Sequence, residues 1–472
     1  MKVSEFKEKK FYSEASGAVA VVDRNIKMEL NEYGLYEEKI TDSEIEMNNQ
    51  VPFVSPNFNN RTSETEIANY LYSNIDNINF DKRIGYYSSL YVGYVKEGEY
   101  REHASSGGMG TWIFKELFDR NLIDYVIHVK KNKDSNNKRL FKYDVSSSVE
   151  EIKEGAKTKY YPVEISEVMD IVKSKPGRYA VIGIPSFIYS IRLLAEADEI
   201  INERIKYTVG LVCGHQKSSK FAESMAWQVG IQPGNLVDID FRHKLLDRPA
   251  SNYAVKMTGI IDGELQTIIK PTSELFGQNW GWGFFKPLAS DFTDDVFNET
   301  ADIVLGDAWL PEYTPDSKGN NVVIVRNSEI DAIVKDAIQE NRLKMDIVDN
   351  ETIFASQASH FRHTHDEFAY RLHIKDKKHE WRPEKRVAAS SDISDTRRKI
   401  QDLRKIISEQ SHIQYQEAVK RNDFNYFVDK MTEYTAEYTA LYRKLSRKTL
   451  LKRVVKMSPK EFTSKLISKI LR

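Results

Sequence analysis

Hydrophobic and polar positions alternate with two different periods in the middle of the chain. A strand-like run over 88–96 leads to a glycine turn over 105–110. A run over 111–122 with apolar residues three and four positions apart comes next, followed by a second strand-like run over 123–130. The change of period from two to about 3.6 residues predicts a strand, a turn, a helix and a second strand in this order.

The same alternation continues toward the C-terminus. It predicts helices over 165–174, 186–200 and 218–230, and strands over 178–185, 206–213 and 321–326. Alternation of this kind is typical of a largely parallel or mixed sheet. Hairpin-like strands between 250 and 345 indicate a further region of mixed composition. We therefore expect an α/β (α+β) fold built on a mixed sheet.

The two ends of the chain differ from this central part. Residues 1 to about 95 are rich in turn-forming residues and predict only short elements. In contrast, 396–421 and 424–445 have the apolar spacing of long helices. No repeat of the solenoid type is present. The chain is thus expected to end in a helical extension.

Composition limits the classes of protein that need to be considered. The 472 residues are 40% hydrophobic, enough for large buried cores, and 69 basic residues nearly balance 70 acidic ones. This balance argues against a nucleic acid as partner of the whole molecule. Cys213 is the only cysteine, so internal disulfides are excluded. With no apolar run of membrane-spanning length and no leader pattern, the sequence predicts a cytoplasmic protein.

The segment SEASGAVAVVD has the spacing of a ferredoxin cluster loop without its cysteines. In such a loop the ligands follow the pattern Cys-x2-Cys-x2-Cys-x3-Cys-Pro. Here the four ligand positions hold Ser13, Ser16, Val19 and Asp23. The same ferredoxin-like spacing recurs over 45–55, followed by Pro56. On these residues alone, a chance match is the alternative.

Longer motifs give this spacing more weight. REHASSGGMGTWIFKELFDRN, YAVIGIPSFIYSIRLL, VGLVCGHQKSSKFAE and ADIVLGDAW occur in this order between 101 and 309. They closely resemble the successive signatures of the beta-subunit family of coenzyme F420 hydrogenases and dehydrogenases, over roughly residues 10 to 340. The resemblance implies a flavoprotein core, a ferredoxin-like N-terminal module and a bound flavin adenine dinucleotide (FAD).

The flavin site implied by the resemblance centres on the SSGG turn. Two glycines before a helix let the backbone approach a diphosphate, and free helix N–H groups and hydroxyls can hold its oxygens. A serine-capped glycine turn with no ligand is the alternative. The expected cofactor-binding residues are Ser105, Ser106, Gly107, Gly108, Thr111, Lys157, Thr158, Lys159 and Tyr160.

The inner iron–sulfur cluster of the family is where this sequence departs most. The positions that match the family's four cysteines hold Ser186, Cys213, Lys286 and Ala289. A lone thiolate cannot hold a four-iron cluster, and lysine and alanine offer iron no soft ligand. We therefore expect a flavin with no iron–sulfur cluster and no other metal. Cys213 is interpreted as a small buried residue.

A flavin without clusters needs an open pocket beside its ring for a diffusible reductant or a substrate. The candidates to line this pocket are His215, Arg242, Lys244, Asp307, Trp309 and Arg326. Arginine and lysine there would bind an anionic substrate. Surface ion pairs and core packing are the alternatives, and no catalytic residue is assigned.

Two further features involve basic residues. His360, His363 and His365 lie close in sequence, but Arg362 and Arg371 beside them argue against a metal site and for a polar loop. The last thirty residues hold eleven lysines and arginines against one acid, Glu461. Such a helix can lie on anionic lipid, so peripheral contact with the inner membrane face is expected; a solvated tail or a helix on an acidic partner is the alternative.

The expected organisation has five parts. These are a degenerate ferredoxin-like module over 1–85, an N-terminal domain of the beta-subunit type over 86–175, the corresponding C-terminal domain over 176–345, a linker over 346–390 and a basic helical extension over 391–472. The resemblance extends to cysteine-depleted family branches associated with polysaccharide assembly. The leading hypothesis is therefore a flavin-dependent enzyme of exopolysaccharide or capsule biosynthesis acting on an activated sugar or glycan. The alternative is a binding or scaffolding subunit without redox chemistry.

Overall fold

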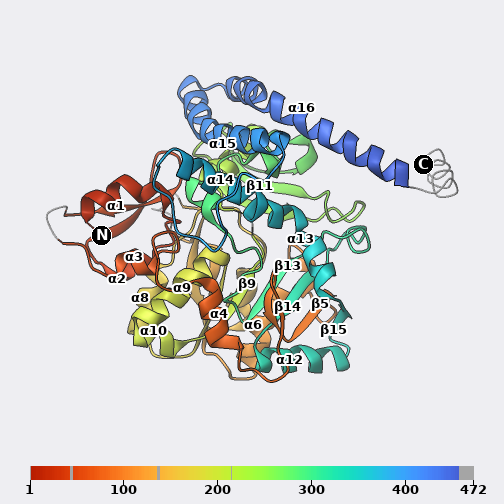
Figure 1. Cartoon of the computed structure of the whole chain (residues 1–472). Helices are drawn as coiled ribbons and strands as arrows, with labels where there is room; N and C mark the ends of the chain where they lie inside the picture. The colour runs from red at the N-terminus through yellow and green to blue at the C-terminus, as the bar shows by residue number, and fades with distance from the viewer. Residues whose placement is uncertain (1, 43–45, 135–138, 214, 457–472) are drawn as a thin grey trace. The chain divides into compact units, whose positions relative to one another are not determined.

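The computed structural model describes residues 2–42, 46–134, 139–213 and 215–456. The chain divides into two compact units (Figure 1). The first comprises 1–278 and 285–392, and the second comprises 279–284 and 393–472. Ile45, in the second stretch with ferredoxin-like spacing, lies outside the described residues. The same holds for most side chains of the basic C-terminal segment.

An eight-stranded mixed sheet forms the centre of the first unit. Its strands are β5 (Ser89–Val95), β6 (Tyr125–Lys131), β7 (Phe141–Ser146), β8 (Tyr179–Gly183), β9 (Ile205–Leu211), β13 (Ile303–Asp307), β14 (Asn321–Val325) and β15 (Leu343–Ile347). They lie in the order β15-β5-β14-β13-β9-β8-β6-β7. The four strands β6, β8, β9 and β13 are parallel, while β7, β14 and β15 each pair antiparallel with their neighbours. The expected mixed sheet is confirmed.

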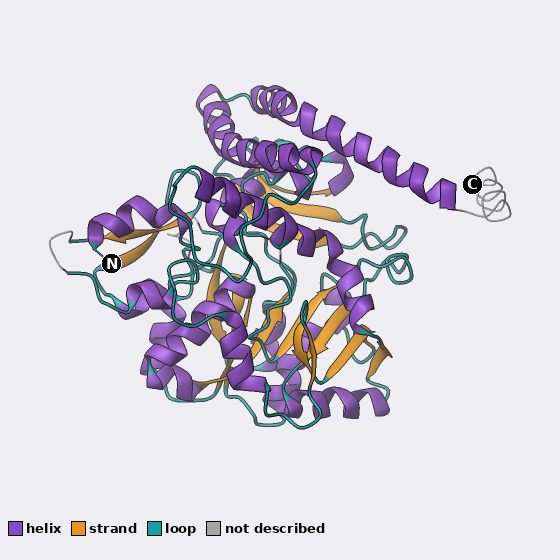
Figure 2. Ribbon diagram, in the orientation of Figure 1, coloured by secondary structure: helices purple, strands orange, loops and turns teal. Residues whose placement is uncertain are grey.

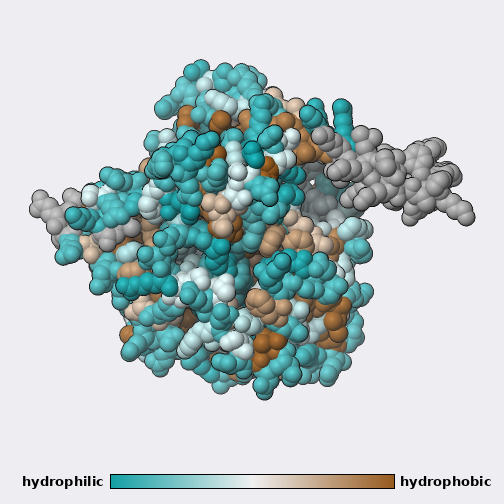
Figure 3. Space-filling view, viewed as in Figure 1, coloured by the Kyte–Doolittle hydropathy of each residue, from teal (hydrophilic) through white to brown (hydrophobic). Residues whose placement is uncertain are grey.

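Both faces of this sheet are buried. Along β14, Val322 and Ile324 belong to one hydrophobic cluster, whereas Val323 and Val325 belong to another on the opposite face. This accounts for the uninterrupted apolar run of that strand, because a strand covered on both sides needs no polar alternation. On the face of the molecule shown in Figure 3, hydrophilic side chains predominate.

Helices cover both faces (Figure 2). Apolar residues of α6 (Met109–Asp119) and α12 (Ser328–Gln339) contribute to one cluster, and those of α8 (Ser166–Ser174) and α9 (Pro185–Ala197) to the other. A proline at the first position of α9 fixes its start. Shorter helices between the strands are α5 (Tyr100–His103), α7 (Val149–Glu154), α10 (Glu199–Arg204) and α11 (Ser219–Trp227).

The N-terminal 85 residues consist of short elements, as expected. They are α1 (Val3–Lys9), η1 (Lys10–Tyr12), α2 (Ala18–Val22), α3 (Val51–Val54), α4 (Glu64–Tyr72) and the hairpins β1/β2 (Ile26–Leu30, Tyr36–Ile40) and β3/β4 (Asn79–Asp81, Gly85–Tyr87). Val19 and Val51 share the core cluster of α8 and α9. Ser16 Oγ donates to Ser190 Oγ at 3.0 Å, and Asp23 accepts the amide of Asn48 at 2.9 Å. The residues at these ferredoxin-like positions thus make ordinary packing contacts and hydrogen bonds.

The remaining part of the first unit adds a small sheet and further helices. The antiparallel sheet consists of β10 (Leu236–His243), β11 (Ala254–Ile261) and β12 (Glu264–Pro271), and short turns are η2 (Thr272–Glu274) and η4 (Leu288–Phe292). Residues 346–390, expected to be a linker, contain α13 (Asn350–Thr364) and α14 (Asp366–Lys377). Their few buried apolar residues, such as Ile353 and Phe368, give only a weak helical pattern in the sequence.

The second unit is a helical hairpin. Helices α15 (Asp395–Arg421) and α16 (Phe424–Lys456) are joined at Asn422, which has a left-handed backbone with φ of 52°. Phe427 packs edge-on against Tyr415 and against Phe284, which follows the short turn η3 (Trp280–Trp282). The expected helical C-terminal region is confirmed. None of the helices within the described residues is long and apolar enough to span a membrane.

Candidate functional site

A cavity of about 290 Å³ lies at the carboxyl ends of the parallel strands of the first unit. Its lining includes Gly183 at the end of β8, Leu211 at the end of β9, Asp307 at the end of β13 and His128 on β6. Loops and helix N-termini gather at this edge of an open α/β sheet, which is therefore the usual place for a ligand.

The SSGG turn forms one wall. Gly108 has φ of +94°, and a Cβ atom there would lie 2.9 Å from the amide nitrogen of Arg101. A Cβ atom at Gly107 would lie 2.7 Å from Asn321 Oδ1 and from the carbonyl oxygen of Gly93. Gly108 is thus required for its backbone conformation, and Gly107 is required because a side chain would not fit there.

Helix α6 begins directly after this turn, at the edge of the cavity. The amide of Met109 donates to Asn321 Oδ1 at 3.2 Å. Gly110 and Thr111 follow in the same turn and line the cavity, and amides at this position in a helix have no intrahelical acceptor. The N-terminus of α6, with the Thr111 hydroxyl, therefore offers hydrogen-bond donors to an anion.

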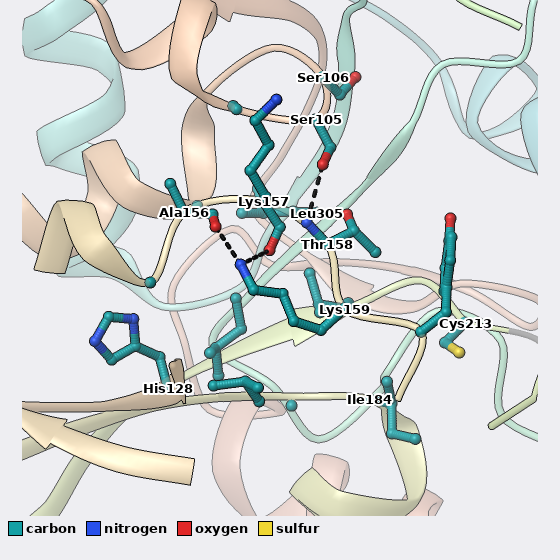
Figure 4. A pocket seen from close by; sticks show the side chains of 18 of the residues that line it. Ser105, Ser106, His128, Ala156, Lys157, Thr158, Lys159, Ile184, Cys213 and Leu305 are labelled. Carbon is teal, nitrogen blue, oxygen red and sulfur yellow. Dashed lines mark hydrogen bonds between the residues drawn. The ribbon is translucent and has the colours of Figure 1, made fainter. Parts of the chain in front are cut away.

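The loop over 155–161 forms an adjoining wall of the cavity. The amide of Thr158 donates to Ser105 Oγ at 2.9 Å, which ties this loop to the SSGG turn (Figure 4). Lys157 forms an ion pair with Asp240 at 2.9 Å. Lys159 Nζ donates to the carbonyl groups of Ala156 and Lys157, the latter at 3.0 Å. Burial lowers the pKa of Lys159 to about 8, so an anion in the cavity would stabilise its ammonium form.

Charged groups gather around a third part of the lining. Arg242 forms an ion pair with Asp307, and its guanidinium lies 4.9 Å from the ring centre of Tyr253 and 5.3 Å from that of Trp309. His215, Lys217 and Cys213 line the cavity as well. Burial raises the pKa of the Cys213 thiol to about 11, so it stays protonated at neutral pH.

The remaining part of the lining is mostly apolar. Phe114 on the second turn of α6 lies beside His128, Gly155 lies against the imidazole ring, and Ile152 lines the cavity as well. The sequence did not predict that His128 lines this end of the cavity. The only local signal was a histidine at an alternate position of an otherwise apolar strand pattern.

The structure brings most of the sequence-predicted residues together. Those that line the cavity are Ser105, Ser106, Gly108, Thr111, Lys157, Thr158, Lys159, Tyr160, His215, Arg242 and Asp307. Gly107 lies in the turn but does not line it, and Trp309, 37% exposed, flanks Arg242.

Two other candidates have different surroundings. Lys244 donates to the carbonyl oxygens of Arg101 at 2.5 Å and Ser106 at 2.9 Å, so it braces the SSGG turn from outside the cavity lining. Burial and nearby cations lower its pKa to about 7. Arg326 is fully buried and donates to carbonyl oxygens of Asn298, Ala301, Ile84 and Phe297, which is a structural arrangement away from the cavity.

The four positions that the sequence resemblance matches to cysteines of the family's inner cluster have varied surroundings. Cys213 lines the cavity, Ser186 lies in the first turn of α9, and Ala289 is buried in η4. Lys286 forms a buried ion pair with Asp291. Among the described residues, no group of three or more His, Cys, Asp or Glu side chains is arranged to hold a metal ion.

Comparison with known proteins adds family information. Two family models of the coenzyme F420 hydrogenase/dehydrogenase beta subunit match the chain, the model of its N-terminal part over residues 90–170 and the model of its C-terminal part over residues 177–351. No curated protein sequence matches the chain. A solved structure of the xenon-derivatized F420-reducing nickel–iron hydrogenase complex from Methanosarcina barkeri is similar, with 15% sequence identity and a TM-score of 0.46. The match covers 62% of this chain and 95% of that one.

Proposed function

Because the chain belongs to the family of coenzyme F420 hydrogenase/dehydrogenase beta subunits, we propose that it is a flavin-dependent oxidoreductase that binds FAD in its cavity. In this proposal it works without iron–sulfur clusters. The observation that carries the proposal is the N-terminus of α6, which follows two sterically required glycines and lines the same cavity as Lys157 and Lys159.

These residues fit a dinucleotide diphosphate. The amides of Gly110 and Thr111 and the Thr111 hydroxyl can donate to phosphate oxygens. Ser105 Oγ accepts from Thr158 and keeps its own hydrogen for a ligand, whereas Ser106 Oγ already donates to the carbonyl of Asn320 at 2.9 Å. Lys159 adds positive charge at low exposure to water. A flavin held here would supply hydride-transfer chemistry, while the chain supplies binding and orientation.

The absence of clusters follows from the ligands that the sequence offers. With Cys213 as the only cysteine, this chain alone cannot bind a cluster that needs four thiolates. Electrons would then come from a diffusible hydride donor, or the reaction would involve no net electron flow.

The charged part of the lining supports an anionic substrate. The guanidinium of Arg242, which is paired with Asp307, and the side chains of Lys217 and His215 line the cavity and can donate hydrogen bonds to such a substrate. An activated sugar or a lipid-linked glycan used in exopolysaccharide or capsule synthesis has suitable anionic groups. Peripheral membrane contact through the basic C-terminal segment belongs to the same proposal.

The native absorption spectrum tests the proposal directly. The purified protein should be yellow and should release FAD on denaturation, or should take up added FAD with quenching of flavin fluorescence. A colourless protein that takes up no FAD would refute the enzyme proposal and would favour a binding or scaffolding subunit.

A further inference from the structure

Strand β12 is an open edge of the small antiparallel sheet. Among the described residues it pairs with β11, which is labelled in Figure 1, and with no other strand. Every residue from Glu264 to Pro271 has a partner on β11 without a register shift, whereas the pairing of β10 with β11 contains shifts. A regular edge strand without a bulge is a template for pairing with a further strand.

The hydrogen bonds of this hairpin determine which backbone groups of β12 point outward. The amide of Thr272 donates to the carbonyl oxygen of Tyr253 at 3.0 Å, one position beyond the pair of Pro271 with Ala254. Hydrogen-bonded and non-hydrogen-bonded residue pairs alternate along an antiparallel ladder. The N–H and C=O groups that point away from β11 therefore belong to Leu265, Thr267 and Ile269.

The same three residues present an exposed side-chain surface. Leu265 is 63% exposed and Ile269 is 47% exposed. Both lie on the same face of β12 as Thr267, because side chains alternate between the two faces along a strand. An acid, Glu264, precedes this run and a base, Lys270, follows it. The exposed edge thus combines free backbone groups, apolar side chains and one charge of each sign at its ends.

The sequence of β12 is complementary to itself when a second copy runs antiparallel to it. With the pair centred on Thr267, Leu265 lies opposite Ile269 of the second copy, and Glu264 lies opposite Lys270 of the second copy. All outward-facing residues are then paired with one another, and each pair can exchange both of its N–H···O=C bonds. The neighbouring registers with the same hydrogen-bonding pattern would place an outward residue against the turn or Pro271 and would separate the opposite charges.

The charges at the two ends of the run can meet their partners in this register. Lys270 forms an exposed ion pair with Glu274 of its own chain at 2.7 Å. An ammonium has three donor hydrogens, so this pair leaves hydrogens for Glu264 of the second copy. Opposite charges directly across an antiparallel pair stabilise it, and like charges destabilise it. The twofold symmetry places such a charge pair at both ends.

We propose that β12 pairs with β12 of a second copy of this chain about a twofold axis at Thr267. The two small sheets become one continuous sheet, and Leu265 packs against Ile269 of the second copy. The contact uses the same edge in both chains, so it is closed at two chains. The inference does not depend on the proposed function, because no residue of β12 lines the cavity.

The molar mass of the full chain in solution tests the backbone pairing. Size-exclusion chromatography with light scattering should give twice the mass of one chain. Thr267→Pro removes an N–H that points away from β11, a position that tolerates proline in an edge strand, and should halve the measured mass. Thr267→Val keeps the amide and the β-branched shape, so this matched control should remain dimeric. Thermal unfolding of each variant verifies that it is folded.

Charge reversal tests the register. Glu264→Lys places lysines opposite each other across the axis, and Lys270→Glu places glutamates opposite each other, so each variant alone should have the mass of one chain. Mixed in equal amounts, the two variants should form a heterodimer, because every charge at the edge again lies opposite its counterpart. A misfolded variant would not recover in this way.

Four results would overturn the inference. A wild-type chain that has the mass of one chain throughout its soluble concentration range would leave this edge to a strand of a different protein. A dimer that persists in Thr267→Pro, or charge variants that form no heterodimer, would place the contact on another surface or in another register. A mass that grows beyond two chains with concentration would show open-ended pairing and refute the twofold contact.

Discussion

Lys286 forms a buried ion pair with Asp291 at a position that the sequence resemblance matches to a cysteine of the family's inner cluster. The side chain of Lys286 is 2% exposed and that of Asp291 is 11% exposed. A buried ammonium needs a negative partner, so Asp291 provides the charge balance that the lysine requires. At this position the side chain forms an ion pair and offers iron no soft ligand.

Loss of this pair should destabilise the protein. Lys286→Met leaves Asp291 buried without its main partner, which typically costs about 3–5 kcal/mol. Arg371 Nε remains 3.9 Å from Asp291, so we expect a loss near the lower end, measured by urea unfolding. As control, Lys318→Met removes the exposed pair with Glu102 and should cost less than about 1 kcal/mol. Equal losses in both variants would contradict the importance of burial.

Protein purified without oxygen should contain no stoichiometric iron and no acid-labile sulfide. The reason is that only Cys213 could supply a thiolate, whereas a four-iron cluster normally has four. Colorimetric iron and sulfide assays measure this directly. Stoichiometric iron and sulfide in the isolated chain would show that other ligands hold a cluster.

The Thr111 hydroxyl should contribute to dinucleotide binding. Thr111→Val keeps the β-branched shape and removes one donor at the N-terminus of α6, so FAD affinity should fall by about 1 kcal/mol, or roughly fivefold. Titration by flavin fluorescence measures the change. Thr267→Val on the exposed strand β12 is the matched control and should bind FAD normally. An unchanged affinity in Thr111→Val would remove this hydroxyl from the site.

Dinucleotide binding should weaken as the pH rises through about 8. Lys159 has its pKa lowered to about 8 by burial, and a bound diphosphate raises that pKa because it favours the ammonium. Affinity is therefore full below the pKa of the free protein and declines above it. Lys159→Met should abolish the decline near pH 8, and a decline that persists there would point to another group.

Arg326 should matter for stability and not for binding. In Arg326→Lys an ammonium cannot reach all four carbonyl groups that the guanidinium serves, so unfolding should become easier by about 2 kcal/mol or more. FAD affinity per folded molecule should stay unchanged. A variant of normal stability with weakened FAD binding would instead place Arg326 in the functional site.

Local patterns predicted a large part of the fold. Strand β5, the SSGG turn and helix α6 lie close to where the sequence predicts them, because hydrophobic period and glycine conformation are properties of neighbouring residues. Strand β7 and helices α7, α12, α13 and α14 were missed. Helix α12 lies in a stretch that was interpreted as hairpin-like strands, although its apolar residues have helical spacing. The other elements have few apolar positions, and contacts with distant elements stabilise them.

The candidate site was predictable only where one motif carries several residues. Ser105, Gly108 and Thr111 line the cavity together because they belong to one turn and one helix end. Lys244 and Arg326 were proposed from charge alone. Their hydrogen bonds to carbonyl groups formed by other segments lie beyond any local pattern.

The sequence by itself determined the alternation of strands and helices in the central part of the chain, the glycine turn before α6, and the presence of one cysteine where a four-iron cluster needs four thiolates. Only the tertiary structure decided that His128, Gly155 and Ser146 meet at one end of the cavity, and that Lys286 faces Asp291 in the interior. Periodicity depends on neighbours along the chain, whereas hydrogen bonds, burial and pKa depend on residues that packing brings together.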